Sequence, residues 1–587
     1  MPKRTCDLRS SSAAWDCSLR RVLAVVVACA ATPALASGQG GRTQARCSGQ
    51  VITEIVVRSE GPSYGRAFER SRMLGNVLVR MHTPTSPEVV RNYLLLKKGD
   101  RCSPLRRSES ERLLRAMPFI SDATVTAYQD GAGVRLEVVT VDEPSMVANL
   151  GVKSNSPFVS RATLGNANLM GNAVYASGQW REGGFYRDAY AARYTNYQLF
   201  GRPYQLDMRW ARRELGSEWT ARVSDPFLTE VQRMAWRLSA GQSNDYAAFR
   251  RPDTLDAALR VRREYMDAGA LTRFGPAGRR GLLGLQMSVE DVEPGSGAVV
   301  VTENGVQDEF IPALEDRYGA WRSVRLNVLL GFRRLRFRRV EGFDALSGSQ
   351  DLRTGVQVSS TMGRALPMSR GIAKDETFAG VEASTGIAGA RTYAALEAQL
   401  EGRHRANGGW EDVLANGRAA AYLKPHPRHL LTVDLTWSSV RDSRLPVQLA
   451  LGDRRGGLRG YRNSWLAGGT RVVGRFEERW RVASIRGTAN AAVAVFTDVG
   501  GVTAGDVPLG VSSGVRQSVG TSLILAIPAK SQRMWRVDFA YPLQRGGGSG
   551  FEVRLSSEDR TQVFWRAPND VSSARERVVP QSIFRWP

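Results

Sequence analysis

The chain has 587 residues, with 81 Lys and Arg against 57 Asp and Glu and a formal net charge of +24. That length allows several domains or one very large one. The basic residues are spread along the whole chain, without the solid blocks that mark nucleic-acid arms, so we expect no nucleic-acid partner.

Residues 1–36 predict a secretory signal peptide. The polar stretch MPKRTCDLRSSSAAWDCSLRR ends in basic residues, and the apolar run VLAVVVACAATPALA finishes on small residues before an expected cleavage after Ala36. This run is shorter than the roughly 20 residues that a membrane-spanning helix needs. The segment VVAC, which ends at Cys29, also fits a lipoprotein cleavage site, so lipidation stays an alternative. In either case we expect the mature chain to be exported.

Residues 37–50 form a small polar linker that contains Cys47. Cys102 is the other cysteine outside the signal peptide. An even pair in an oxidising compartment indicates one disulfide, and two free thiols are the alternative.

Residues 51–143 predict a small α+β domain with the order strand, helix, helix, strand, strand. VITEIVV is rich in β-branched residues, and DATVTAYQD and VRLEVVTVDE alternate on either side of the turn DGAG. Ser86 is the expected cap of the first helix, which should run to KKGD at Gly99. Ser108 is the expected cap of the second helix.

Residues 144–565 change to a strict period of two, which indicates β-strands. In YQLDMRW, LTVDLTW and WRVDFAY the apolar residues share one face and polar or charged residues the other. A soluble sandwich also shows this alternation, but about 420 residues of it is long for one sandwich. Aromatic residues at strand ends and an export signal favour an outer-membrane β-barrel with a polar lumen.

The barrel is therefore expected to be all-β and antiparallel. At roughly 26 residues for each strand and its connection, the segment predicts about 16 strands, an even number as such barrels need. The barrel should end near TQVFW, which leaves residues 566–587 as a C-terminal tail.

The order of several motifs is similar to that of the BamA/TamA superfamily of outer-membrane proteins. SESERLLRAMPFISDATVTAYQDGAGVRLEVVTVDE resembles a POTRA domain. LGNANLMGNAVY, SDPFL, LRGY, GRFEERW, FTDVGGV and VDFAYPL then resemble barrel landmarks in family order. The resemblance covers nearly all of the mature chain. It implies one POTRA-like domain in the periplasm and a 16-stranded barrel in the outer membrane.

LRGY resembles the family signature of the sixth extracellular loop, which folds back into the barrel. The signature residues here are Arg459, Gly460 and Tyr461. The resemblance implies that this arginine meets acidic groups on the lumen wall, where a guanidinium fork suits a carboxylate. An exposed cationic loop is the alternative.

The expected partners come from two further motifs. FTDVGGV matches the family strand Phe-x-Asp-x-Gly with Phe496, Asp498 and Gly500, and GRFEERW supplies Glu477 and Glu478. If the family contact between the loop arginine and the lumen wall holds here, Arg459 should reach Asp498 and one of the two glutamates.

The chain departs from the family pattern in three ways. It has one POTRA-like unit, residues 61–85 look like an insertion, and a tail follows the expected last strand. The family usually ends on the aromatic residue of its last strand, so the resemblance does not by itself fix the C-terminal targeting signal or the closing seam, which is expected between a first strand at 145–156 and a last strand at 550–565.

Two stretches suggest chemistry that their context does not favour. GVSSG, residues 510–514, fits a nucleophile elbow, but that elbow needs a strand before it and a helix after it. HPRH, with His426 and His429, follows Pro425 and contains Pro427, and these prolines predict a turn. We expect no enzyme activity and no catalytic, cofactor or metal site.

Three functions stay open at this point. The resemblance favours a barrel that inserts or translocates polypeptide, with outer-membrane lipid, extended polypeptide clients and periplasmic or lipoprotein proteins as partners. A dedicated two-partner-type secretion pore and a passive porin-like barrel are the alternatives.

Overall fold

The computed structural model describes residues 43–62, 82–152, 159–183, 186–252, 255–302, 304–367, 376–406, 408–485, 488–544, 546–559 and 568–578. The expected signal peptide, Cys29 and most of the linker lie outside the described residues, as does the stretch at which the barrel is expected to end. Ala45–Pro587 form one compact unit. No helix among the described residues is both long enough and apolar enough to cross a bilayer.

The N-terminal part of this unit is a small α+β domain with the predicted element order. Its elements are β1 (Ile52–Glu60), α4 (Pro87–Asn92), α5 (Pro104–Arg115), β2 (Ile120–Asp130) and β3 (Gly133–Asp142). The sheet order is β1-β3-β2, with β1 parallel and β2 antiparallel to β3. Strands β1 and β2 are therefore the two edges of the sheet.

Both helices differ from their predicted bounds. Helix α4 is capped by Ser86, as expected, but it ends long before Gly99. Tyr93 ends it, because its ring is 1% exposed and its hydroxyl donates to the Tyr197 carbonyl at 2.9 Å. Helix α5 begins one turn before the expected cap, since Pro104 has the fixed φ that suits a first helical position. Ser108 lies inside that helix.

The domain core is apolar and is closed at one end by a disulfide. Val90, Leu114 and Val138 are fully buried in its centre, and residues of the barrel pack against the same cluster. Cys47 and Cys102 form the expected disulfide inside a second small cluster. The bond ties the start of the described chain to the loop before α5.

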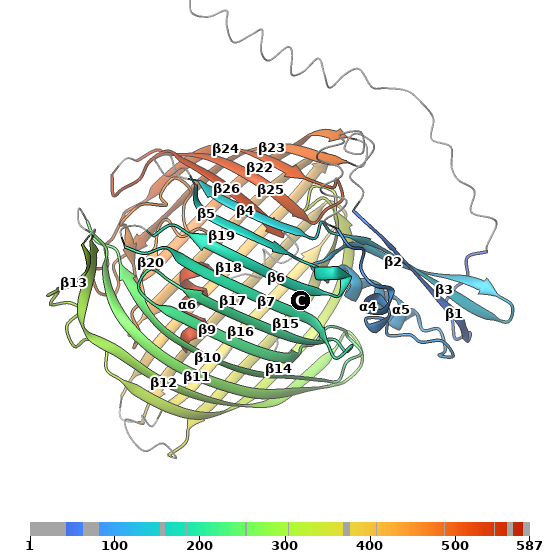
Figure 1. Ribbon diagram of the computed structural model, residues 1–587, viewed down its shortest axis with the longest axis horizontal. Helices are drawn as coiled ribbons and strands as arrows, with labels where there is room; N and C mark the ends of the chain where they lie inside the picture. The colour runs from blue at the N-terminus through green and yellow to red at the C-terminus, as the bar shows by residue number, and fades with distance from the viewer. Residues whose placement is uncertain are drawn as a thin grey trace, which may run out of the picture. The chain divides into compact units, whose positions relative to one another are not determined.

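The rest of the unit is a closed, antiparallel β-barrel (Figure 1). Neighbouring strands in the chain are neighbours in the wall, and β26 meets β4 to close it. A single 3-10 turn, η1 (Leu169–Gly171), separates the second and third wall strands. The strands are β4 (Met146–Val152), β5 (Val159–Asn166), β6 (Val174–Arg181), β7 (Ala189–Leu199), β8 (Tyr204–Arg212), β9 (Ser217–Asp225), β10 (Met234–Phe249), β11 (Ala257–Phe274), β12 (Arg280–Thr302), β13 (Gly305–Glu309), β14 (Trp321–Glu341), β15 (Ser349–Ala365), β16 (Glu376–Ala388), β17 (Thr392–Arg405), β18 (Trp410–His426), β19 (His429–Arg441), β22 (Thr470–Ile485), β23 (Ala489–Thr503), β24 (Arg516–Ala526), β25 (Arg533–Pro542) and β26 (Glu552–Asp559).

The predicted count of about 16 strands is wrong. Strand β13 only extends the hairpin of β12, which pairs directly with β14, so the wall has about twenty strands among the described residues. The error came from assuming one strand length throughout. Strand β4 has 7 residues whereas β12 has 23, and the short strands from β4 to β9 fit more crossings into the same length of chain.

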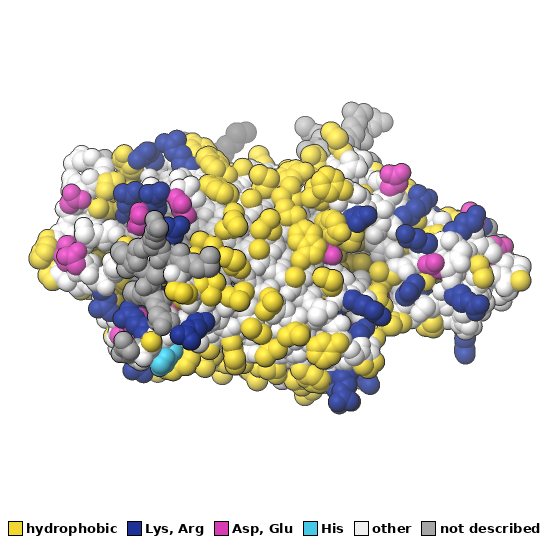
Figure 2. Space-filling view, turned by 90° about the horizontal axis from the view of Figure 1, so that it is seen from below, with side chains coloured by type: hydrophobic (Ala, Val, Ile, Leu, Met, Phe, Trp, Pro, Cys, Tyr) yellow, Lys and Arg dark blue, Asp and Glu magenta, His cyan; other side chains and the backbone are white. Residues whose placement is uncertain are grey.

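Side chains sort by face as the alternation predicts. Met208 and Trp210 point outward, while Asp207, next to Met208 in the strand, accepts hydrogen bonds from Arg193 inside. Figure 2 shows hydrophobic side chains gathered over the middle of the wall, with Lys and Arg toward its ends. An apolar outer face and a charged interior follow from one period-two pattern, and the closed wall excludes the sandwich alternative.

Candidate functional site

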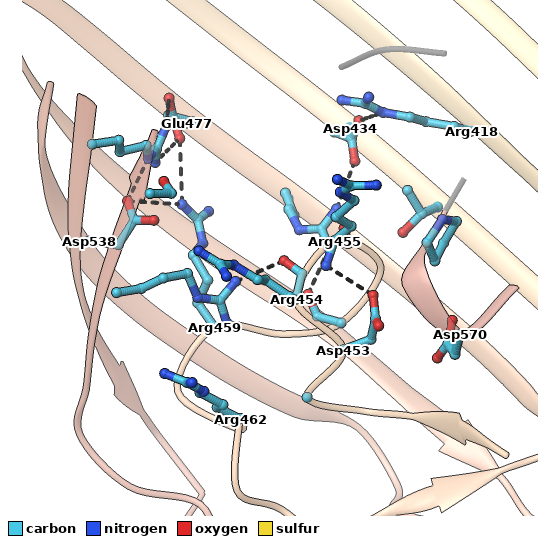
Figure 3. Close-up of a pocket in the computed structure, with 18 of the residues that line it drawn as sticks. Arg418, Asp434, Asp453, Arg454, Arg455, Arg459, Arg462, Glu477, Asp538 and Asp570 are labelled. Atoms are coloured by element: carbon cyan, nitrogen blue, oxygen red, sulfur yellow. Dashed lines mark hydrogen bonds and ion pairs between the residues drawn. The ribbon is translucent and has the colours of Figure 1, made fainter. Parts of the chain in front are cut away.

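A long loop folds from the end of the barrel into its lumen. Residues 442–469 connect β19 to β22 and carry a short hairpin of β20 (Leu449–Ala450) and β21 (Ala467–Gly468). Leu458 and Tyr461, at the tip, are completely buried. A glycine-rich stretch that looks like an exposed loop in sequence is therefore an interior element (Figure 3).

Arg459 at the loop tip is clamped by Asp498 of β23. Its Nε and one terminal nitrogen donate to the two carboxylate oxygens at 2.8 and 2.6 Å, and its backbone N–H donates to the same group at 3.2 Å. The carboxylate is completely buried. The structure thus brings together the arginine and the aspartate that the motifs suggested, in the bidentate geometry that suits them.

Further carboxylates lie around the same guanidinium. Glu477 of β22 is 3.5 Å from Arg459 and is held by Arg536, whose nitrogens donate to it at 3.0 and 2.6 Å. Arg536 also donates to Asp538 at 2.6 Å. Arg459, Glu477, Arg536 and Asp538 therefore form an alternating network of cations and anions on the lumen wall, in which each of the four charges has a neighbour of opposite sign.

The other signature residues position the loop tip. Gly460 has a φ of +86°, which an L side chain rarely adopts, and its N–H donates to Glu552 at 2.7 Å. The Tyr461 hydroxyl lies 3.2 Å from the carbonyls of Gln517 and Gln544. These contacts fasten the tip to the last strands of the barrel, close to the seam.

Phe496 and Gly500 of the FTDVGGV motif have different structural roles in the barrel wall. The ring of Phe496 lies under Arg459, with the guanidinium carbon 3.3 Å from the ring centre, a cation–π contact. Gly500 does not meet the loop tip. A Cβ there would lie 2.3 Å from the Val472 carbonyl, so glycine allows the close approach of β22.

Glu478 is not part of this site. Successive residues of a strand point to opposite faces, so Glu477 faces the lumen and Glu478 turns away from it. Glu478 instead lies 2.6 Å from the Nε2 of His429 on the neighbouring strand. Of the two glutamates offered by GRFEERW, the structure brings only Glu477 to Arg459.

A second buried arginine holds the base of the loop. Arg444 donates to Glu376 at 2.7 Å and to Asp412 at 3.2 Å. Arg403 of β17 shares both carboxylates, and Trp321 packs against the two guanidiniums. Sequence reasoning missed this site, because nothing in VRDSRLP distinguishes Arg444 from an exposed loop arginine.

The C-terminal tail also enters the lumen. Helix α6 (Asn569–Val578) places Asp570 against Arg471, with one nitrogen to oxygen distance of 2.9 Å. Val571 is completely buried against the loop base and the wall. One turn further, Arg575 donates to Glu401 at 3.1 Å and to Asn416 at 2.7 Å. The helix bridges the loop and the wall.

A cavity of about 1000 Å³ remains between the loop, the helix and the wall (Figure 3). Its lining includes Arg454, Arg455 and Arg462 from the loop and Asp570 from the helix. Arginine and carboxylate side chains dominate the lining, so the remaining lumen is polar and suits water or a hydrophilic chain.

The two stretches that suggested chemistry have structural roles here. Ser512, the serine of the elbow pattern, lies in the loop before β24, and its hydroxyl oxygen accepts a hydrogen bond from the Ala504 N–H at 3.1 Å. His429 begins β19 and contacts Glu478. His426 pairs with His429 across the turn between β18 and β19.

A closed barrel with an apolar outside and a charged, partly filled lumen defines a transmembrane β-barrel as the class of this chain. No protein-family model and no curated protein matches the sequence.

The chain is similar to several solved outer-membrane barrels. BamA from Haemophilus ducreyi, lacking POTRA domains 1-3, matches with a TM-score of 0.37 and 13% identity over 87% of this chain and 85% of that chain. CdiB from Escherichia coli matches with a TM-score of 0.34 and 11% identity over 90% of this chain and 91% of that chain. The copper transporter OprC matches with a TM-score of 0.33 and 9% identity over 71% of this chain and 78% of that chain.

Proposed function

We propose that this chain is an outer-membrane protein of the BamA/TamA type that inserts or translocates polypeptide. The observation that carries the proposal is the loop tip Arg459-Gly460-Tyr461 locked onto Asp498 inside a barrel that also carries an α+β domain. A passive pore has no need of a loop that fills its lumen, nor of a domain with open sheet edges at one end.

Strand β1, beyond Ile52, is the edge that we propose for extended clients, since Ile52 itself exchanges backbone hydrogen bonds with Gly99 and Asp100. The other edge, β2, is already used in part, because its Ala127 carbonyl accepts from Ala45 at 2.9 Å and its Val125 carbonyl accepts from Arg107 at 2.6 Å. An added strand on β1 gains backbone hydrogen bonds without needing a particular sequence.

The seam between β26 and β4 is the proposed exit toward the membrane. Both strands are short, at 8 and 7 residues, so opening this pair breaks few backbone hydrogen bonds. In a bilayer an unpaired strand edge is costly, so a client strand that pairs with it is stabilised. The domain reaches this region, since Glu143 accepts from Ser531 and from the Gln532 N–H at 2.6 Å each.

The first test is depletion of the protein, followed by quantitative proteomics of the outer-membrane and secreted fractions together. A broad fall in other barrels supports an insertion factor. Loss of one secreted protein with unchanged barrels shows a dedicated secretion pore instead. No change in either fraction overturns both and favours a passive barrel.

A dedicated secretion pore is the second candidate, and the polar lumen cavity favours it. In that case the client passes through the lumen, and α6 must leave first. Covalently tethering the helix to the wall would then block secretion. Under the leading proposal the client uses the seam, and the tether would leave insertion intact.

A further inference from the structure

The outer face of β14 changes character along its length. From one end to the other the outward residues are Arg322, then the apolar run Val324, Leu326, Val328, Leu330 and Phe332, and then Arg334, Arg336 and Arg338. The apolar run continues on β12 and β15, where outward residues such as Leu283, Leu285, Val356 and Val358 are exposed. The three arginines, the arginine ladder, therefore begin where the apolar band ends.

The ladder lies at the end of the barrel that carries the α+β domain. The next residue, Arg339, donates to Asp122 of β2 at 3.0 Å and to Glu111 of α5 at 3.3 Å. In the neighbouring turn Gly278 approaches the Leu335 carbonyl, which brings the exposed Arg279 beside the ladder.

Among the residues that the structure describes, the ladder arginines have no acidic partner. Arg338 donates to the Ala388 carbonyl at 3.2 Å, and within the described ranges no carboxylate forms an ion pair with any of the three.

The opposite end of the same wall differs. Arg322 lies 3.9 Å from Asp291, and Arg262 of β11 lies 3.0 Å from Glu264 and 3.5 Å from Glu293. Arg262 and Arg322 thus have carboxylate neighbours at this rim, which the ladder arginines lack among the described residues.

We propose that the arginine ladder binds the phosphodiester head groups of anionic glycerophospholipids in the membrane leaflet on the side of the α+β domain. The proposal rests on the placement of the barrel in a membrane, not on what the barrel transports. Three guanidiniums on alternate residues of one strand are spaced about 7 Å apart. Each presents a planar fork that matches two phosphate oxygens, and the apolar band beside them holds the acyl chains of the same lipid. Long cationic side chains at this depth extend toward the head groups.

The test uses the full chain, purified in detergent and incubated with mixed micelles of phosphatidylglycerol and phosphatidylcholine. After removal of excess lipid, the retained lipids are counted by mass spectrometry. The ladder variant carries Arg334→Gln, Arg336→Gln and Arg338→Gln. The matched control carries Arg260→Gln, Arg262→Gln and Arg322→Gln, which removes the same charge from the opposite rim.

We expect the ladder variant to retain about tenfold less phosphatidylglycerol than the natural protein, since each basic residue near an anionic leaflet adds to the attraction. The control should stay within about twofold, and phosphatidylcholine should not change in either. Equal losses in both variants, or an unchanged ladder variant, would overturn the proposal. If the triple variant does not fold, Arg336→Gln alone should still give a loss that the single control Arg322→Gln does not.

Two further arms separate the sources of phosphate. Inorganic phosphate added at the concentration of the lipid should leave phosphatidylglycerol bound, and displacement by it would show a free phosphate site. Lipid A, offered at equal concentration, should not depend on the ladder, and a ladder-dependent preference for it would place the site in the wrong leaflet. Failure of the proteomic test above changes none of these outcomes.

Discussion

The tip and the base of the lumen loop are both held by a buried arginine, but the two sites are built differently. Arg459 at the tip clamps Asp498 with two side-chain hydrogen bonds, and Glu477 lies 3.5 Å away, held by Arg536. Arg444 at the base shares Glu376 and Asp412 with a second cation, Arg403. Among the described residues Arg459 is the one cation that hydrogen bonds to Asp498, so its removal leaves that carboxylate without one, whereas Arg403 stays beside Glu376 and Asp412 when Arg444 is removed. The tip is therefore the more vulnerable site.

The largest effect is expected for Arg459→Ala. It leaves the completely buried Asp498 without its cation, which costs about 3–5 kcal/mol in comparable buried pairs. The barrel should unfold at a lower temperature on semi-native gels and lose activity, while export of the chain stays intact. The exposed Arg462→Ala, three residues along the same loop, is the control. Unchanged heat resistance and activity would show that the tip clamp does not hold the loop.

A smaller effect is expected for Arg444→Ala. Arg403 remains beside Glu376 and Asp412, so the loss should be about 1–3 kcal/mol, as for a hydrogen-bonded partner removed from a buried group. The same gel assay measures it. A loss larger than that of Arg459→Ala would reverse the ranking of the two sites.

Asp570→Asn probes the contact of α6 with the loop. Arg471 keeps the Ala450 carbonyl as an acceptor, so the barrel should lose only about 1 kcal/mol of stability. The helix should leave the lumen more often, which raises single-channel conductance in planar bilayers. Ser572→Ala, on the same helix, is the control. Conductance equal to that of the natural protein would mean that the ion pair does not retain the helix.

The smallest effect is expected outside the lumen, at Glu109 of α5. Burial alone would raise the pKa of Glu109, but the hydrogen bonds and charge of Arg112 lower it below its ordinary value of 4.5. A carboxyl with a lowered pKa stabilises the folded state above its ordinary pKa, and this contribution is lost as the pH falls through the folded value.

Glu109→Gln should accordingly loosen the junction between domain and barrel at pH 7 by about 1 kcal/mol, because the Glu109 carboxylate also accepts from the Glu230 N–H of the barrel. Limited proteolysis of the domain measures the loosening. The difference between the variant and the natural protein should shrink as the pH falls below 4.5 and through the lowered pKa of Glu109. A difference that persists below that pKa would exclude ionisation as its cause.

The sequence by itself determined the elements whose pattern is local. The period-two alternation placed Met208 and Trp210 outside and Asp207 inside, because side-chain direction follows from backbone geometry alone. The order of elements in the α+β domain follows from capping residues and short periodic runs. The partnership of Arg459 and Asp498 came from motifs in the order of a known family.

The tertiary structure decided what depends on distant parts of the chain. The strand count changed because strand lengths vary from 7 to 23 residues, which a uniform repeat hides. Glu477 rather than Glu478 reached the loop, because the register of β22 in the closed wall selects one face. Arg444 and α6 gained their partners only when the barrel closed, since residues more than 30 positions away supply the opposite charges.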